Sequence, residues 1–298
     1  MATLPRPAAD HEHWLEVDGV RTRFLHYPCS APKSAGPALL LIHGLLGFSY
    51  SWRRNVEALS RRADVYAIDL PGVGYSARLS KFDCRMRALA RFLLRFMELL
   101  GLSSVDLIGT SHGGALAMMA AILEHETTAA ARIQRLVLAA PVNPWSQGNE
   151  RIVALLASTV GSWGLRAVYP LLARNRQYFL RRVYGDAGRI PPGAAEAYAV
   201  PLRISGTIDH LLTVVRGWRR DIAELTRLLP LIRDTPTLLL WGSLDPAVLP
   251  SSAEPLARCF KHAEVHVIEG SGHLPYEETP EEFNRIVLDF LHGSSSKQ

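Results

Sequence analysis

The sequence predicts an α/β fold in which a mostly parallel sheet is flanked by helices and carries an inserted helical cap. The first observation is an alternation of short apolar runs, typical of buried strands, with amphipathic helical patterns. Such alternation requires crossover connections, which place helices on both faces of a parallel sheet. The second observation is one long interval, 145–232, that has helical patterns and no strand of this type. The strand-like runs lie at 37–44, 63–70, 104–111, 133–141, 235–243 and 263–270.

The segment before the first of these runs predicts an antiparallel hairpin. Residues 13–28 form two runs rich in β-branched and aromatic residues, with Asp18-Gly19 between them. Two helices are expected between the first three parallel strands, in "SWRRNVEALS" and in the long amphipathic "FDCRMRALARFLLRFMELLG". The hairpin therefore leads into the edge of the parallel sheet.

The cap divides the chain into three kinds of segment. We expect an α/β core at 13–144 and 233–292, a helical cap at 145–232, and flexible ends at 1–12 and 293–298. The cap holds 12 arginines and 6 acidic residues, which leaves 21 basic and 22 acidic residues of the 33 and 28 in the whole chain. This basic excess can attract an anionic substrate, but a solvated outer face is the favoured interpretation.

Composition excludes several classes of protein. The 298 residues are 48% hydrophobic and can bury a large core, yet no run reaches the length of a bilayer span and the N-terminus lacks a signal-peptide pattern. Three widely spaced cysteines fit neither a disulfide framework nor a metal site. The net charge of +5 is mild and the basic residues are not interleaved with aromatics as in nucleic-acid binders. We therefore expect a cytoplasmic protein without stable membrane insertion, and the sequence does not reveal its oligomeric state.

A serine between glycines follows the third parallel strand. In "LIGTSHGGAL" (107–116), Ser111 lies between Gly109 and Gly113, and the helix-forming "ALAMMAAILEHE" starts at Ala115. Glycines lack a Cβ, so they let two segments pass closely while the residue between them adopts an uncommon backbone conformation. Such a turn exposes the hydroxyl of Ser111 to a substrate.

A serine hydroxyl needs a base to accept its proton, and a carboxylate to orient that base. In an open α/β sheet, functional groups gather at the carboxyl ends of the strands. Asp245 follows the strand "TLLLWGS" in the loop "LDPAV", and His273 follows "VHVIEG" in "SGHLPYEE". We therefore expect Ser111, Asp245 and His273 to form a catalytic triad.

With these motifs in order, the chain from about residue 13 to 292 resembles the serine-nucleophile, esterase-like branch of the α/β-hydrolase superfamily, in which the cap varies from family to family. The resemblance implies the triad order Ser111, Asp245, His273, with a nucleophile elbow at 109–113. It also implies an oxyanion hole formed by the backbone N–H groups of Leu45 and His112, and neither a cofactor nor a metal. The matching motifs are His43-Gly44, "DLPGVGYS" (69–76), the elbow, "WGSLDP" (241–246) and "GSGHLPYEE" (270–278).

Other candidate residues have structural interpretations. Asp69 also ends a strand, but the resemblance assigns its motif to a structural turn near the site. Some relatives carry the acid after the strand that reads "LVLAAPVN" here, where Asn143 stands and no carboxylate is close. His43 is expected to be a buried, hydrogen-bonded residue that shapes its loop. Whether the imidazole of His112 faces the substrate pocket stays open.

The favoured function is hydrolysis of carboxylic esters of small to medium, mainly apolar substrates through an acyl-enzyme on Ser111. Trp145, Trp163 and Trp218 are candidate pocket residues, or pack inside the cap. A serine nucleophile excludes the dehalogenase and epoxide hydrolase branches, which use a carboxylate. A carbon–carbon bond hydrolase remains an alternative, although "HGLLG" lacks the extra glycine and proline often found in those relatives. Haloperoxidase, acyltransferase and a ligand-binding receptor on the same fold also remain.

Overall fold

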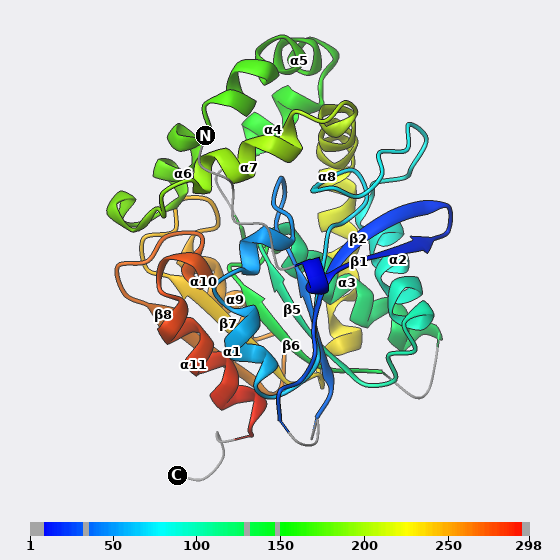
Figure 1. The fold of residues 1–298 in the computed structure, drawn as a ribbon, viewed down its shortest axis with the longest axis vertical. Helices are drawn as coiled ribbons and strands as arrows, with labels where there is room; N and C mark the ends of the chain where they lie inside the picture. Colours follow the sequence, from blue (N-terminus) through cyan, green and yellow to red (C-terminus); the bar gives the residue numbers. More distant parts are fainter. Residues whose placement is uncertain (1–8, 32–35, 128–131, 147–149, 294–298) are drawn as a thin grey trace.

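The computed structural model describes residues 9–31, 36–127, 132–146 and 150–293. Its centre is an eight-stranded sheet with the order β1-β2-β4-β3-β5-β6-β7-β8 (Figure 1). Strands β3 to β8 run parallel, while β2 pairs antiparallel with both β1 and β4. This confirms the predicted fold class. The strands are β1 (Glu12–Val17), β2 (Val20–Tyr27), β3 (Ala38–Ile42), β4 (Val65–Ile68), β5 (Val105–Thr110), β6 (Ile133–Ala139), β7 (Thr237–Gly242) and β8 (Ala263–Ile268).

The predicted hairpin is formed by β1 and β2, with Val17 paired to Val20 across a two-residue turn. Asp18 and Gly19 both have positive φ, 48° and 80°, as a type I′ turn requires. Aspartate and glycine are among the residues that tolerate this conformation, so the dipeptide fixes the register of the hairpin.

The two faces of the sheet carry separate apolar cores because side chains alternate along each strand. In β3, Leu40 and Ile42 join the core beneath α2 (Met86–Leu99) and α3 (His112–Thr127). Leu39 and Leu41 join the core on the opposite face, beneath α1 (Val56–Ser60) and α11 (Pro280–Leu291). Helix α3 is buried along nearly its whole length, which makes it the central support of the turn at Ser111.

The remaining helices of the core are short. They are α9 (Ala253–Ala257), α10 (Pro275–Glu278) and the 3₁₀ helices η1 (Ala9–His11), η2 (Ser49–Trp52), η4 (Leu229–Ile232) and η5 (Pro250–Ser252). Helix α10 follows β8 directly after a loop, so it lies beside the functional end of the sheet.

The segment predicted as a cap, 145–232, contributes five α-helices in its described part. They are α4 (Glu150–Ala157), α5 (Thr159–Arg174), α6 (Arg176–Val183), α7 (Ala194–Leu202) and α8 (Thr207–Leu228), with the 3₁₀ helix η3 (Ala187–Arg189) after α6. Figure 1 shows α4 to α7 gathered at one end of the molecule, with α5 outermost. A small apolar cluster around Phe48, Leu180 and Tyr198 attaches α6 and α7 to the core.

The ends of the chain lie mostly outside the described residues. Of the predicted flexible segment 1–12, the last four residues form η1 and the first residue of β1; of 293–298, only Gly293 is described. Within the described ranges, none of the helices has both the length and the apolar content needed to cross a bilayer.

Candidate active site

Ser111 lies on a sharp turn between β5 and α3, as the sequence predicts. Its φ is +53°, a left-handed conformation that is uncommon for any residue other than glycine. Hydrogen bonds on both sides hold the turn: the N–H of Ser111 donates to the Ala139 carbonyl at 3.0 Å, and its own carbonyl accepts from the Val142 N–H at 2.9 Å. The strained backbone is therefore fixed by the neighbouring strand β6 and by the residues that follow it.

The glycines that flank Ser111 are required by close backbone contacts. A Cβ on Gly113 would lie 2.4 Å from the His43 carbonyl oxygen, and one on Gly109 would lie 2.5 Å from the Gly113 carbonyl oxygen. Neither carbonyl can move without displacing a central strand or α3. The Gly-x-Ser-x-Gly spacing thus has a steric cause in this fold.

Asp245 and His273 form a buried hydrogen-bonded pair. The Nδ1 of His273 lies 2.8 Å from Oδ2 of Asp245, and the Asp245 side chain has no solvent exposure. The other carboxylate oxygen, Oδ1, accepts from the N–H groups of Ala247 and Val248 at 2.8 and 3.0 Å. Because Nδ1–H donates to the carboxylate, the lone pair of the neutral imidazole is at Nε2, where a base needs it.

The loops that carry this pair are packed tightly against each other. A Cβ on Gly242, at the end of β7, would lie 2.1 Å from the Gly272 carbonyl oxygen. The N–H of Leu244 also donates to the Ser271 carbonyl at 2.9 Å. These contacts set the separation between the Asp245 loop and the His273 loop through backbone atoms alone.

The helical segment supports the His273 loop directly, a contact that the sequence reasoning missed. The N–H of His273 donates to the Val183 carbonyl at 2.7 Å. The carboxylate of Glu278 accepts from Gly272 N–H at 2.9 Å on one side and from Gly185 N–H at 2.8 Å on the other. The end of α6 and the loop of His273 are thus joined through one buried side chain.

Glu277, beside it, anchors the same region to the core. Its carboxylate accepts hydrogen bonds from the Tyr184 and Tyr198 hydroxyls and lies 2.7 Å from Arg53. Burial alone would lower the pKa of Arg53, but the charge of Glu277 raises it above its ordinary value. In the sequence, Glu277 and Glu278 are the adjacent glutamates of "LPYEE". An acidic pair in an otherwise apolar motif is the pattern that could have identified them.

The turn that would supply the second oxyanion donor lies against Ser111. A Cβ on Gly44 would lie 3.1 Å from the Cβ of Ser111, so the backbone of this turn passes directly beside the serine. Leu45 follows Gly44, and Leu46 has a positive φ of 60°. His112 is the first residue of α3, where backbone N–H groups point out of the helix at its positive end. The structure therefore places the backbone of Gly44, which precedes Leu45, against Ser111, and His112 directly follows the serine at the start of α3.

His43 is buried and fully hydrogen-bonded, which confirms the structural interpretation. Its Nδ1 lies 2.8 Å from the Gly44 carbonyl, and its Nε2 accepts from the Leu70 N–H at 3.1 Å. These partners require a proton on Nδ1 and none on Nε2, and burial lowers the pKa of the ring. His43 is consequently a neutral link between two loops.

Asp69 likewise has the structural role expected for it. Its buried carboxylate accepts from Ser49 N–H at 2.7 Å and from Tyr75 N–H at 2.9 Å, and it lies 3.2 Å from Arg23. Both oxygens are used by these neighbours. Asp69 organises the "DLPGVGYS" turn, whereas Asp245 is the carboxylate that contacts His273.

A small cavity lies beside the Leu45 turn and His112. Its walls are three histidines, His43, His112 and His210, together with apolar side chains and Gly44, and its volume of about 10 Å³ holds roughly one water molecule. Burial lowers the pKa of His112 to about 3 and that of His210 to about 4. His210, from α8, also contacts Cys84, with Nδ1 3.0 Å from Sγ. His210 could not be identified from the sequence because nothing in the amphipathic pattern of α8 distinguishes it.

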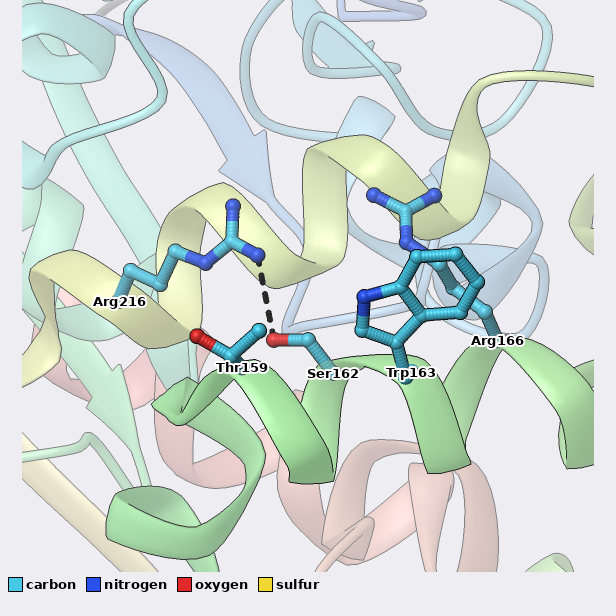
Figure 2. Close-up of a pocket in the computed structure, with 5 residues that line it drawn as sticks. All are labelled: Thr159, Ser162, Trp163, Arg166 and Arg216. Carbon is cyan, nitrogen blue, oxygen red and sulfur yellow. Dashed lines mark hydrogen bonds between the residues drawn. The ribbon is translucent and has the colours of Figure 1, made fainter.

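The three candidate pocket tryptophans occupy different environments. Trp218 stacks on the ring of His112 with centroids 5.8 Å apart, so the imidazole of His112 is covered by α8. Trp145 is partly buried and packs against the larger apolar core. Trp163 is not brought to this cavity: it is 73% exposed on α5 and lines a separate concavity with Arg166 and Arg216 (Figure 2).

Comparisons with known proteins agree with this geometry. Residues 37–280 match the family model described as the alpha/beta hydrolase fold. The chain is 24% identical over 277 residues to an uncharacterized hydrolase, YugF, of Bacillus subtilis, covering 92% of this chain and 96% of that protein.

Solved structures share the architecture. Cfl2 from Burkholderia cenocepacia superposes with a TM-score of 0.80 at 21% identity, covering 94% of this chain and 95% of that one. The meta-cleavage product hydrolase CumD from Pseudomonas fluorescens superposes with a TM-score of 0.75 at 23% identity, covering 95% and 98%. The family match and the relatives support a hydrolase. The chain belongs to the alpha/beta hydrolase fold family.

Proposed function

We propose that the protein is a serine hydrolase that cleaves carboxylic esters through an acyl-enzyme on Ser111. The observation that carries the proposal is the left-handed turn at Ser111, held at the carboxyl edge of the sheet that also carries the buried His273–Asp245 pair. A serine in a strained backbone conformation contributes little to folding, whereas nucleophilic catalysis requires a serine presented on such a turn.

In the proposed reaction, Oγ of Ser111 attacks the ester carbonyl carbon while its proton passes to Nε2 of His273. The carbonyl oxygen becomes an anion, which the N–H groups of Leu45 and His112 stabilise. Collapse of this intermediate expels the alcohol, which takes the proton from His273 and leaves the acyl group on Ser111. A water molecule then attacks the acyl-enzyme with His273 as base, and the carboxylic acid departs. Throughout, Asp245 orients His273 and stabilises its charged form.

The cavity beside the oxyanion donors favours a mainly apolar substrate. Its lining includes Leu45, Leu70 and Val214, and the imidazoles of His112 and His210 are neutral above about pH 5 because burial lowers their pKa values. With room for only about one water molecule, the cavity admits an acyl group only if α8 or its side chains move. We therefore propose that the segment 145–232 acts as a lid, with Trp218 on α8 as a specificity residue.

The test is a panel of p-nitrophenyl esters of increasing acyl length, run beside a p-nitroanilide and a dienone substrate. We expect turnover of short and medium neutral esters with an acyl-length optimum. Matched esters that end in a carboxylate should be at least tenfold poorer in kcat/KM, about 1.4 kcal/mol of transition-state discrimination. A preference for the anionic series would contradict the proposed pocket.

Two other functions make different predictions for the same panel. A carbon–carbon bond hydrolase would turn over the dienone faster than every ester. A ligand-binding receptor would turn over none of them and would leave Ser111 unlabelled by a fluorophosphonate. The chemistry of acyl transfer requires Ser111, so Ser111→Ala is the control for each substrate that shows activity.

A further inference from the structure

Helix α5 exposes an apolar face that nothing in the hydrolytic mechanism uses. Val160, Trp163 and Leu171 are 80%, 73% and 69% exposed, and Val168 and Leu172 are also exposed. The spacing of these residues is that of one side of a helix, which normally packs against a core. Soluble proteins rarely expose a contiguous apolar stripe of this kind, so the face is expected to have a partner.

A basic concavity borders this apolar face. It has a volume of about 430 Å³ and is lined by Thr159, Ser162, Trp163, Arg166 and Arg216. Figure 2 shows the two guanidinium groups projecting to the same side of α5, with the indole of Trp163 beside Arg166. Trp163 belongs to both features, so the apolar face and the basic concavity form one continuous surface.

The concavity has a net positive charge. Arg166 is paired with Asp209. Arg216 donates to the hydroxyl of the buried Ser162 at 3.2 Å, and among the described residues no carboxylate pairs with it. One arginine is therefore held in place by a neutral partner, with its charge available to an anion.

We propose that the outer face of α5 rests on the surface of an anionic phospholipid bilayer, with a headgroup phosphate in the concavity beside Arg216. The apolar side chains of α5 enter the boundary between headgroups and acyl chains, while the arginines lie at the level of the phosphates. A helix of 16 residues is about 24 Å long, enough to lie along a membrane surface.

Charge favours a bilayer over a second copy of this chain. A symmetric dimer through α5 would bring the same arginine-rich surfaces together, and the whole segment 145–232 holds 12 arginines against 6 acidic residues. Like charges across an interface oppose association, whereas an anionic lipid surface complements them. The surface is also at the end of the molecule opposite the last turn of α11, where α5 is outermost (Figure 1).

The experiment measures binding of the full chain to vesicles of phosphatidylcholine alone and of phosphatidylcholine with about one third phosphatidylglycerol. We expect binding to the anionic vesicles that weakens as salt is raised. Leu171→Glu should lower the apparent affinity about tenfold or more, because it removes an exposed leucine that would enter the bilayer and places a carboxylate against lipid.

The matched control is Leu99→Glu, which adds the same charge at a residue that is 40% exposed at the end of α2. Leu99 lies shortly before β5, near the amino ends of the parallel strands and therefore away from α5. This variant should bind vesicles like the wild type. Arg216→Gln should weaken binding about fivefold on anionic vesicles and should not change the signal with vesicles of phosphatidylcholine alone. Circular dichroism checks that each variant is folded.

Three results would overturn the proposal. One is the absence of vesicle binding by folded wild-type protein. Another is an equal loss of binding in Leu171→Glu and Leu99→Glu. The third is a wild-type dimer in light scattering that Leu171→Glu converts to a monomer, which would assign the face to a second copy of the chain. Each readout is independent of ester turnover, so failure of the proposed reaction would not be mistaken for failure of the docking surface.

Discussion

The edge of the sheet that carries Ser111 and the outer helix α5 are built in opposite ways. At the sheet edge, a Cβ added to Gly109, Gly113 or Gly242 would meet backbone atoms within 2.5 Å. On α5, a Cβ on Gly161 would meet the Leu155 carbonyl at the start of the helix, but Gly164 on the outer face has nothing within 4 Å, and large apolar side chains face outward there. The proposed reaction site thus lies in a part of the fold held by close backbone contacts, and the proposed lipid contact lies on an exposed helix face that has room for substitution.

This difference separates the expected effects of substitution. Changes at the sheet edge should lower kcat or the free energy of unfolding, because they alter reacting groups or backbone packing. Changes on the helical segment should alter KM, acyl-length preference or vesicle binding. The two regions meet where Val183 and Gly185 contact the His273 loop and where Trp218 stacks on His112.

The largest effect is expected from Asp245→Asn. The asparagine can keep the two backbone hydrogen bonds to Oδ1, but it presents His273 with the wrong partner and leaves the imidazolium uncompensated. We expect kcat to fall about 10⁴-fold with an unfolding midpoint close to wild type. The comparison variant Asp69→Asn should instead lose stability, because Asp69 accepts two backbone N–H groups and contacts Arg23. A larger loss of kcat in folded Asp69→Asn would exchange the two roles.

The second-largest effect is expected on the free energy of unfolding, from a substitution at Gly113. Gly113→Ala places a methyl group 2.4 Å from the His43 carbonyl oxygen and should lower the free energy of unfolding by about 3 kcal/mol. Urea unfolding monitored by tryptophan fluorescence measures this change. A variant as stable as the wild type would show that the elbow can relax, contrary to the rigid sheet edge described above.

A smaller effect is expected on the stability of the fold at acidic pH, to which His210 contributes. Burial, with Arg78 and His43 adding to it, lowers the pKa of His210 from 6.5 to about 4 in the folded protein. Between these values the unfolded chain binds a proton that the folded protein does not. The contribution of neutral His210 to stability is therefore complete above pH 6.5 and is lost as the pH falls toward 4.

His210→Gln removes this titration. We expect the loss of stability between pH 7.5 and 5 to shrink by about 2 kcal/mol relative to wild type. His266→Gln, at an exposed position on β8, is the matched control for the replacement of a histidine by glutamine. Identical pH dependences in wild type and His210→Gln would contradict the assignment of a buried, neutral His210.

The smallest effect is expected on α5. Gly164 lies within the helix with open space around it, so Gly164→Ala should raise the free energy of unfolding by about 0.5 to 1 kcal/mol through higher helix propensity. Thermal unfolding measures the gain, and kcat for a soluble ester should not change. Destabilisation by this alanine would mean that the outer face of α5 is covered rather than free.

The features that local chemistry dictates could be predicted from the sequence. The central strands β3 and β7 are apolar runs because they are buried on both faces, and Asp18-Gly19 specifies its own turn. The position of Ser111 follows from the glycines at 109 and 113. The pairing of Asp245 with His273 follows from two loops that leave the same edge of the sheet.

What could not be predicted depends on how distant helices pack. An apolar stripe reads the same whether it faces a core or solvent, so the exposure of Trp163 on α5 was not apparent. His210 and Cys84 are 126 residues apart in the chain and meet only because α8 crosses the Gly72 turn. The support of His273 by Val183 and Glu278 also involves mostly backbone atoms, which leave no side-chain pattern.

The most direct test of the account is to identify the residue that carries the acyl group. Wild-type protein is mixed with p-nitrophenyl acetate, quenched with acid within the first turnovers, and analysed by intact mass and peptide mapping. We expect a single added acetyl group on the peptide that contains Ser111, and neither a mass increase nor steady turnover in Ser111→Ala. An acetyl group on another residue, or turnover retained above about one tenth in folded Ser111→Ala, would contradict the claim that Ser111 is the nucleophile.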